Sequence, residues 1–234
     1  MTRLPTLFIS HGSPMLAIQE SLAHRFLLTL GDTLPRPKAI LVASAHWETS
    51  AAPAVSLTPD PQTIHDFGGF PRALFEIEYG APGAPEVAAR AVAELERQGV
   101  TAQTHATRGL DHGAWVPLRL MYPQADIPVA QISVVRGASP AEHLRIGRAL
   151  SSLRDEGVLV IGSGWCATAS RRRSPPATTL PKNTCLRCSS RWARRVTGRK
   201  WNIGTPAMST VCWLWTSTPF NNPYLCDLRR HRHL

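Results

Sequence analysis

The sequence has no unbroken apolar run of about 18 residues, which is the length that a membrane-spanning helix requires. Its N-terminal apolar stretch is short and ends at His11, without the longer apolar core and small-residue cleavage site of a signal peptide. It also lacks a GxGxxG turn, a P-loop and a nucleophile elbow, which argues against nucleotide-binding and α/β-hydrolase classes. We therefore expect a cytoplasmic protein with no membrane partner.

Acidic residues are almost missing from residues 165–234, where Asp227 stands against 13 lysines and arginines and the net charge is +12. Residues 1–164 hold 15 acidic and 13 basic residues, a net of −2, and contain no cysteine. The total charge of +10 would suggest a nucleic-acid partner, but it averages two unlike segments. We expect one folded domain in residues 1–164 and a basic tail in residues 165–234.

Residues 1–164 alternate between strand-like and helix-like patterns. Strands are predicted at residues 6–10, 39–47, 127–134 and 158–164, and helices at residues 17–30, 84–99 and 139–157. Ser139 and Glu142 have the spacing of a capping box at the start of the last helix. Such alternation predicts an α/β fold with a mostly parallel central sheet and flanking helices, and with ligands at the carboxyl ends of the strands.

The tail has a different composition, with all five cysteines and five of the seven tryptophans of the chain. It has no convincing amphipathic helix, and its charge imbalance is typical of disordered segments. Cys185 and Cys188 form a CxxC pair, but no second pair stands at a spacing that suits a zinc knuckle. The arginines could attract nucleic acid by charge alone, without a folded module to give specificity. We expect the tail to be irregular, either disordered or out of frame.

Two of the nine histidines stand at the ends of predicted strands. His11 follows the first strand and His46 ends the second, so both could point into one crevice at the same edge of the sheet. A neutral imidazole is the commonest metal ligand, and it can also act as a base near neutral pH. The alternative is that each is a hydrogen-bonded structural histidine.

Two further histidines lie in loop-like motifs. His65 precedes a glycine pair, which would let the backbone approach a ligand closely. His112 lies between Asp111 and a glycine, and Asp111 could orient its imidazole as carboxylates do for ligand and base histidines. A tight surface loop and an Asp-His turn are the structural alternatives.

Four stretches taken together resemble the DODA-type class III extradiol aromatic ring-opening dioxygenases. They are HGSPM at residues 11–15, SAHW at residues 44–47, HDFGGFP at residues 65–71 and LDHGAWVPL at residues 110–118. Each motif is weak alone, but four in the same order and spacing are specific. The resemblance extends from residue 5 to about residue 164.

The resemblance implies an α/β fold around one mononuclear metal, zinc or iron(II). By motif, it makes His11 and His46 metal ligands, His112 the acid/base residue, and His65 a residue that lines the substrate pocket. The implied partners are a small aromatic diol of the catechol type and O2, and the implied reaction opens the ring next to the diol. The sequence carries no indication of the oligomeric state.

The chain departs from the family where a third metal histidine should follow the fourth strand. Thr168 stands at that position, and no histidine follows until His231 and His233. We interpret the change as a slip of the reading frame near Gly164. Read from their third base, the codons of residues 165–168 can encode valine, then arginine or cysteine, then histidine, which restores the family's spacing.

The expected function is thus a metal-dependent extradiol dioxygenase, impaired in this chain by the missing ligand. One alternative is an inactive remnant whose basic tail binds acidic partners without specificity. A second is another metal enzyme, such as a hydrolase, on the same scaffold.

Overall fold

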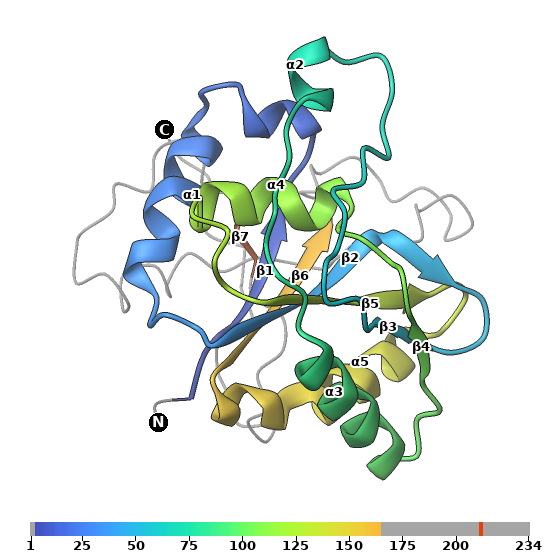
Figure 1. Cartoon of the computed structure of the whole chain (residues 1–234). Coiled ribbons are helices and arrows are strands. Elements are labelled where there is room, and N and C mark those ends of the chain that lie inside the picture. Colours follow the sequence, from blue (N-terminus) through green and yellow to red (C-terminus); the bar gives the residue numbers. More distant parts are fainter. Residues whose placement is uncertain (1–2, 165–210, 213–234) are drawn as a thin grey trace, which may run out of the picture.

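The computed structural model describes residues 3–164 and 211–212 and has a central β-sheet with helices on both faces (Figure 1). The strands of the described residues are β1 Thr6–Ser10, β2 Ala39–Thr49, β3 Ala54–Ser56, β4 Gln103–His105, β5 Val129–Val135, β6 Val158–Gly164 and β7 Val211–Cys212. The helices are α1 Leu22–Thr33, α2 Arg72–Phe75, α3 Pro85–Arg97, α4 His112–Met121 and α5 Pro140–Ala149, with 3-10 helices η1 Pro14–Ala17 and η2 Leu150–Glu156.

The described strands form one sheet in the order β4-β3-β5-β2-β6-β1-β7. β2 pairs in parallel with both β5 and β6, β6 pairs in parallel with β1, and β3 with β4. The contacts of β3 with β5 and of β7 with β1 are antiparallel. The α/β fold with a mostly parallel sheet is therefore confirmed.

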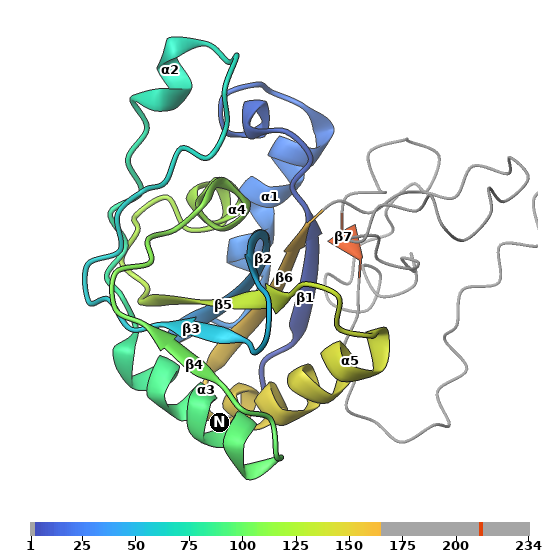
Figure 2. The same cartoon turned by 90° about the vertical axis from the view of Figure 1, so that its right-hand side faces the viewer.

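Two helical layers cover the sheet, with α1 and α4 on one face and α3 and α5 on the other (Figure 2). Successive residues of a strand point to opposite faces, so both layers draw on the same apolar run. In β2, Ile40 and Val42 pack in the core with α1 and α4, whereas Ala39 and Leu41 pack in the core with α3. Burial on both faces explains why β2 has a continuous apolar stretch instead of an alternating one.

The four predicted strands are confirmed, and two predicted helices differ in detail. The helix expected from residue 17 begins at Leu22, because the Ser21 side chain accepts a hydrogen bond from the His24 N–H and caps it there. The helix expected over residues 139–157 starts with the predicted capping box, but it is α-helical only to Ala149 and continues as η2. Gly157 ends η2 with a φ of 89°, a conformation that favours glycine.

β7 is a two-residue strand that the sequence did not predict, and it extends the sheet beyond β1. The other residues of the expected basic tail, Thr168 and the CxxC pair among them, lie outside the described residues. The domain boundary at Gly164 therefore stays a prediction. Among the helices of the described ranges, none combines the length and the apolar character needed to cross a membrane.

The parallel strands bring their carboxyl ends to one edge of the sheet. Ser10 at the end of β1 is in register with Gly164 of β6, and Ser163 of β6 is in register with Ser44 of β2. The chain leaves β1 at this edge through His11. The edge is thus the place where residues that are distant in sequence can meet.

Candidate metal centre

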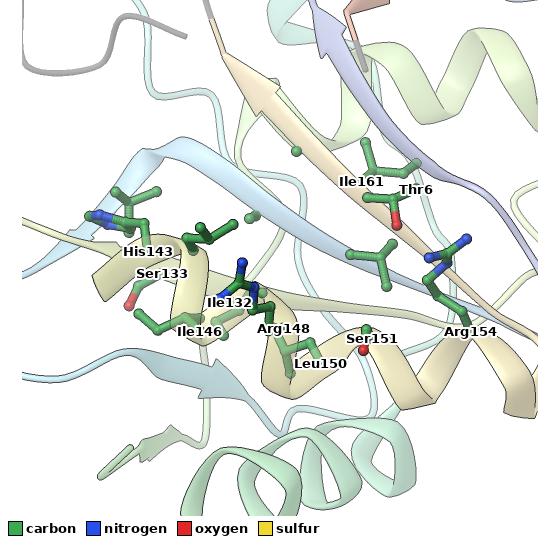
Figure 3. A pocket seen from close by; sticks show the side chains of 16 residues that line it. Thr6, Ile132, Ser133, His143, Ile146, Arg148, Leu150, Ser151, Arg154 and Ile161 are labelled. Carbon is green, nitrogen blue, oxygen red and sulfur yellow. The ribbon is translucent and has the colours of Figure 1, made fainter. Parts of the chain in front are cut away.

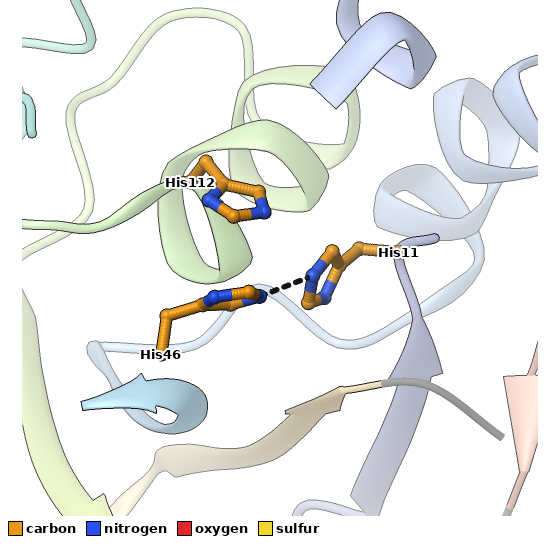
Figure 4. A group of neighbouring side chains, drawn as sticks. All are labelled: His11, His46 and His112. Atoms are coloured by element: carbon orange, nitrogen blue, oxygen red, sulfur yellow. Dashed lines mark hydrogen bonds between the residues drawn. The ribbon is translucent and has the colours of Figure 1, made fainter. Parts of the chain in front are cut away.

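Three histidines meet at the carboxyl edge of the sheet, each from a different element (Figure 4). His11 follows β1, His46 lies within β2, and His112 is the first residue of α4. One ring nitrogen of each lies within 4.8 Å of the others. The centroid of the His112 ring is 3.9 Å from that of His46 and 5.2 Å from that of His11. The structure therefore brings together three of the four histidines predicted for the site.

An irregularity in β2 sets the position of His46. From Ala43 to Glu48 the strand advances five residues, while its partner β5 advances only two, from Ile132 to Val134. Such a bulge bends a strand and redirects its side chains, and bulges are common near active sites. The extra residues let His46 lie against His11 and α4 instead of within the regular pleat.

The contact between His11 and His46 fits a shared metal ion. Their Nε2 atoms lie 3.0 Å apart, and the contact is drawn as a dashed line in Figure 4. Two imidazole nitrogens bound at about 2.0–2.1 Å to one ion are roughly 2.8–3.4 Å apart, for octahedral to tetrahedral angles. Imidazole is a suitable ligand for both zinc and iron. His11 and His46 are therefore placed as a pair of ligands to one ion would be.

Burial keeps the first of these histidines neutral. The His11 side chain is 4% exposed, and burial lowers its pKa to about 3, helped by the neighbouring His112 and His46 and opposed by Asp66. Burial also lowers the pKa of His46. A neutral imidazole keeps a nitrogen lone pair for a metal, so both residues are in the ligand form at neutral pH.

Asp66 is the carboxylate that orients His112. Its Oδ1 accepts hydrogen bonds from Nδ1 and from the backbone N–H of His112, at 2.9 and 3.0 Å. Its Oδ2 is 3.6 Å from Nδ1 of His46. Burial acts to raise the pKa of Asp66, but the hydrogen bonds from His112 outweigh it and lower the pKa to about 2. Asp66 is therefore ionised at neutral pH.

The prediction that Asp111 orients His112 is wrong. Asp111 is fully buried at the N-cap of α4, where its carboxylate accepts hydrogen bonds from Ser44, Arg108 and Gln131. These bonds anchor the start of α4 to Ser44 of β2 and Gln131 of β5, and the partner of the His112 ring is Asp66 instead. The sequence pattern did not single out Asp66 as a partner of His112, although Asp66 directly follows His65 in the HDFGGFP motif.

Gly113 makes room for the three rings. A Cβ at this position would collide with Ser44 Oγ and come within 3.0 Å of His46 Cδ2 and 3.1 Å of His11 Cε1. α4 can therefore approach the strand ends only because this residue has no side chain. The motif LDHGAWVPL contains this glycine, but its packing role depends on contacts across the sheet edge.

Replacing Gly113 by alanine is expected to lower the free energy of unfolding by about 1–3 kcal/mol, the usual range for overpacking a buried site. The control is Gly80→Ala, because Gly80 is exposed and a Cβ there meets no atom within 4 Å. Urea unfolding of the two variants measures the difference. An unchanged unfolding midpoint in Gly113→Ala would contradict the close packing of α4 against the strand ends.

His65 does not join the three histidines. Its Nε2 lies 3.0 Å from the carbonyl oxygen of Ile77, and its ring lies among Phe67, Phe75 and Trp115. Phe67 also contacts His112 edge to face, with 5.6 Å between the ring centroids. His65 is thus one aromatic ring away from the cluster, in an aromatic wall next to it.

A cavity of about 100 Å³ lies between α5 and the strands, on the face of the sheet opposite to α4 (Figure 3). Thr6, His143 and Ile146 are among the residues that line it, and none of the four predicted site residues is. Pockets for small organic ligands are usually about 300–1,000 Å³. We therefore do not assign the site to this cavity.

The parallel sheet and the histidine cluster define an α/β protein with a candidate mononuclear metal centre. Residues 5–167 match the family described as "Catalytic LigB subunit of aromatic ring-opening dioxygenase". The chain belongs to this family, which confirms the resemblance seen in the sequence motifs.

Individual relatives agree with the family. The chain is 50% identical over 175 residues to a "4,5-DOPA dioxygenase extradiol" of Beta vulgaris, which is 73% of this chain and 65% of that protein. It is 48% identical over 163 residues to a protein of the same name from Escherichia coli K12, which is 70% of this chain and 59% of that protein. A crystal structure of an uncharacterized protein from Escherichia coli K12 matches with a TM-score of 0.57 and 39% identity, and covers 69% of this chain and 60% of that one. The chain therefore spans about three fifths of the length of these relatives.

Proposed function

We propose that the chain is a metal-dependent extradiol dioxygenase that inserts O2 into a catechol-type ring and opens it. The observation that carries the proposal is the cluster of His11, His46 and His112 at the strand ends of a member of this family. The names of the relatives support the substrate class, because DOPA carries two adjacent ring hydroxyl groups.

His11 and His46 are the proposed metal ligands, through their Nε2 atoms, and the metal is zinc or iron(II). When bound, the metal supplies the Lewis acidity that favours loss of a catechol proton and, in the case of iron(II), the electron transfer that activates O2. The reaction balances without a further reductant. One ring C–C bond next to the diol breaks, both oxygen atoms enter the product, and the ring carbons supply the electrons that O2 accepts.

His112 is the proposed acid/base residue. Asp66 holds its Nδ1, so Nε2 is left to take a proton from the substrate hydroxyl and to return it later. The carboxylate of Asp66 also stabilises the imidazolium that forms in between. His65 is the proposed substrate-binding residue, together with the neighbouring Phe67, whose ring separates it from His112.

The test uses the purified chain, loaded with iron(II) without oxygen and then mixed with a panel of catechols and ¹⁸O2. The proposal predicts a ring-opened product with both ¹⁸O atoms, formed slowly if the missing third ligand impairs the site. Oxygen uptake that yields only a quinone, or metal binding with hydrolysis of an ester or amide substrate and no oxygen uptake, would contradict it. In this assay Asp66→Asn removes the charge that stabilises the His112 imidazolium and should slow product formation. Asp60→Asn, a change in an exposed loop, is its matched control.

A further inference from the structure

The hydroxyl group of Ser163 determines which nitrogen of His11 carries the proton. Ser163 is 2% exposed, and its Oγ donates its only hydrogen to the carbonyl oxygen of Gly113 at 2.5 Å. Toward His11 Nδ1, 2.9 Å away, the same oxygen can only accept. His11 must therefore carry its proton on Nδ1, and its Nε2 is left with a lone pair.

Asp66 determines in the same way which nitrogen of His112 carries the proton. An ionised carboxylate only accepts hydrogen bonds, so Nδ1 of His112 must be the donor in the 2.9 Å contact with Oδ1. The second bond to this oxygen, from the backbone N–H of His112, fixes the carboxylate relative to the start of α4. The Nε2 atom of neutral His112 is therefore also left with a lone pair.

The proton of His46 is not fixed by a hydrogen bond to Asp66. Its Nδ1 is 3.6 Å from Asp66 Oδ2, which is beyond hydrogen-bond distance. Its Nε2 is 3.0 Å from Nε2 of His11, and two lone pairs cannot face each other at this distance. Because the His11 proton is on Nδ1, His46 must donate from Nε2 when no metal is bound.

We propose that Ser163 and Asp66 are positioning residues that hold His11 and His112 in the Nδ1–H form, and that the tautomer of His46 alone switches when a metal binds. This inference rests on the proposed function, because it takes the space between the three Nε2 atoms as the metal and substrate site. Before the metal binds, the proton on His46 Nε2 occupies the line between the two ligand nitrogens. With a metal held by its Nε2, neutral His46 would carry its proton on Nδ1, which lies 3.6 Å from the second oxygen of Asp66.

The direct test is the long-range ¹H–¹⁵N spectrum of the ¹⁵N-histidine-labelled chain, which distinguishes the two neutral tautomers of each ring. In the metal-free chain we expect Nδ1–H for His11 and His112 and Nε2–H for His46. Addition of zinc should change His46 to Nδ1–H and leave the other two unchanged. An Nε2–H signal from His11 or His112 in the unaltered chain would overturn the proposal, whether or not any variant folds.

Variants separate positioning from a purely structural role. Ser163→Ala should release His11 and Asp66→Ala should release His112, each toward the Nε2–H form, while Asp66→Asn keeps an acceptor oxygen and should preserve the Nδ1–H form of His112. An Nε2–H on His11 would donate to His46 Nε2, so in Ser163→Ala the His46 proton should move to Nδ1 as well. Zinc affinity should fall about 10–100-fold in Ser163→Ala, which loses the partner of the ligand His11, and in Asp66→Ala, which loses the carboxylate facing Nδ1 of the ligand His46, and should not change in Asp60→Ala. Lower thermal stability with unchanged tautomers and zinc affinity would contradict a positioning role. Correct tautomers without oxygen uptake would refute the proposed function and leave this inference intact.

Discussion

If the reading frame slips after Gly164, as we propose, restoring it is expected to raise the metal affinity of the chain by at least about 100-fold, because even the loss of a residue that only supports a ligand costs about 10–100-fold. Under this hypothesis the restored frame would place a histidine at the position of Thr168, as the family pattern requires. The match to the family ends at residue 167, close to the proposed slip, which supports this interpretation. Competition with a coloured chelator measures the affinity of the two chains side by side.

The unaltered chain and the frame-restored chain should also differ in their rate of turnover. We expect the unaltered chain, with Thr168 in place, to bind less than one metal per molecule after purification and to consume little oxygen with catechols. Full metal occupancy and equal oxygen uptake in both chains would contradict the expected impairment. Sequencing the genomic DNA across codons 160–170 tests the slip itself, and an in-frame sequence that matches intact relatives without an insertion or deletion would refute it.

Replacing His46 by alanine is expected to abolish the remaining metal binding, with at least about a 100-fold loss of affinity, because only His11 would remain of the proposed ligand pair. The His46 side chain is about one third exposed, at 35%, so its removal should leave the core unchanged. The matched control is His105→Ala on β4, which removes an exposed imidazole whose ring contacts Trp47.

Calorimetric titration with zinc, together with thermal unfolding, tests whether His46→Ala loses metal binding without losing its fold. His46→Ala should unfold at nearly the same temperature as the control while its zinc binding heat disappears. If the variant binds zinc as tightly as the control, His46 is not a ligand and the metal centre lies elsewhere.

The sequence predicted all four long strands, although β2 continues to Thr49 and His46 lies within it instead of at its end. Parallel strands bring their carboxyl ends to one edge of the sheet, whatever the loops between them do. His11 and His46 could be paired on that basis alone. α4 was not predicted as a helix, because it contains Pro117 and because nearly all of its residues are buried, so it has no polar face to give a helical period. β3 and β4 have three residues each, which is too short for a pattern to stand out.

The partners of the histidines could not be predicted in the same way. Asp66 and His112 are 46 residues apart, and Ser163 and His11 are 152 residues apart, so only the folded chain brings them together. Sequence proximity pointed instead to Asp111, whose carboxylate is bound by Ser44, Arg108 and Gln131. Motifs thus identified the three histidines that cluster, while the residues that hydrogen-bond to them could be found only from tertiary contacts.

The most direct test of the central claim is a titration of the metal-free chain with iron(II) in the absence of oxygen, alongside His46→Ala and His105→Ala. If His11 and His46 hold the metal, the chain and the His105→Ala control should bind one iron weakly and with equal affinity, and His46→Ala should bind none. Equal binding by all three chains, or no binding by the unaltered chain at any iron concentration, would contradict the assignment of the metal centre.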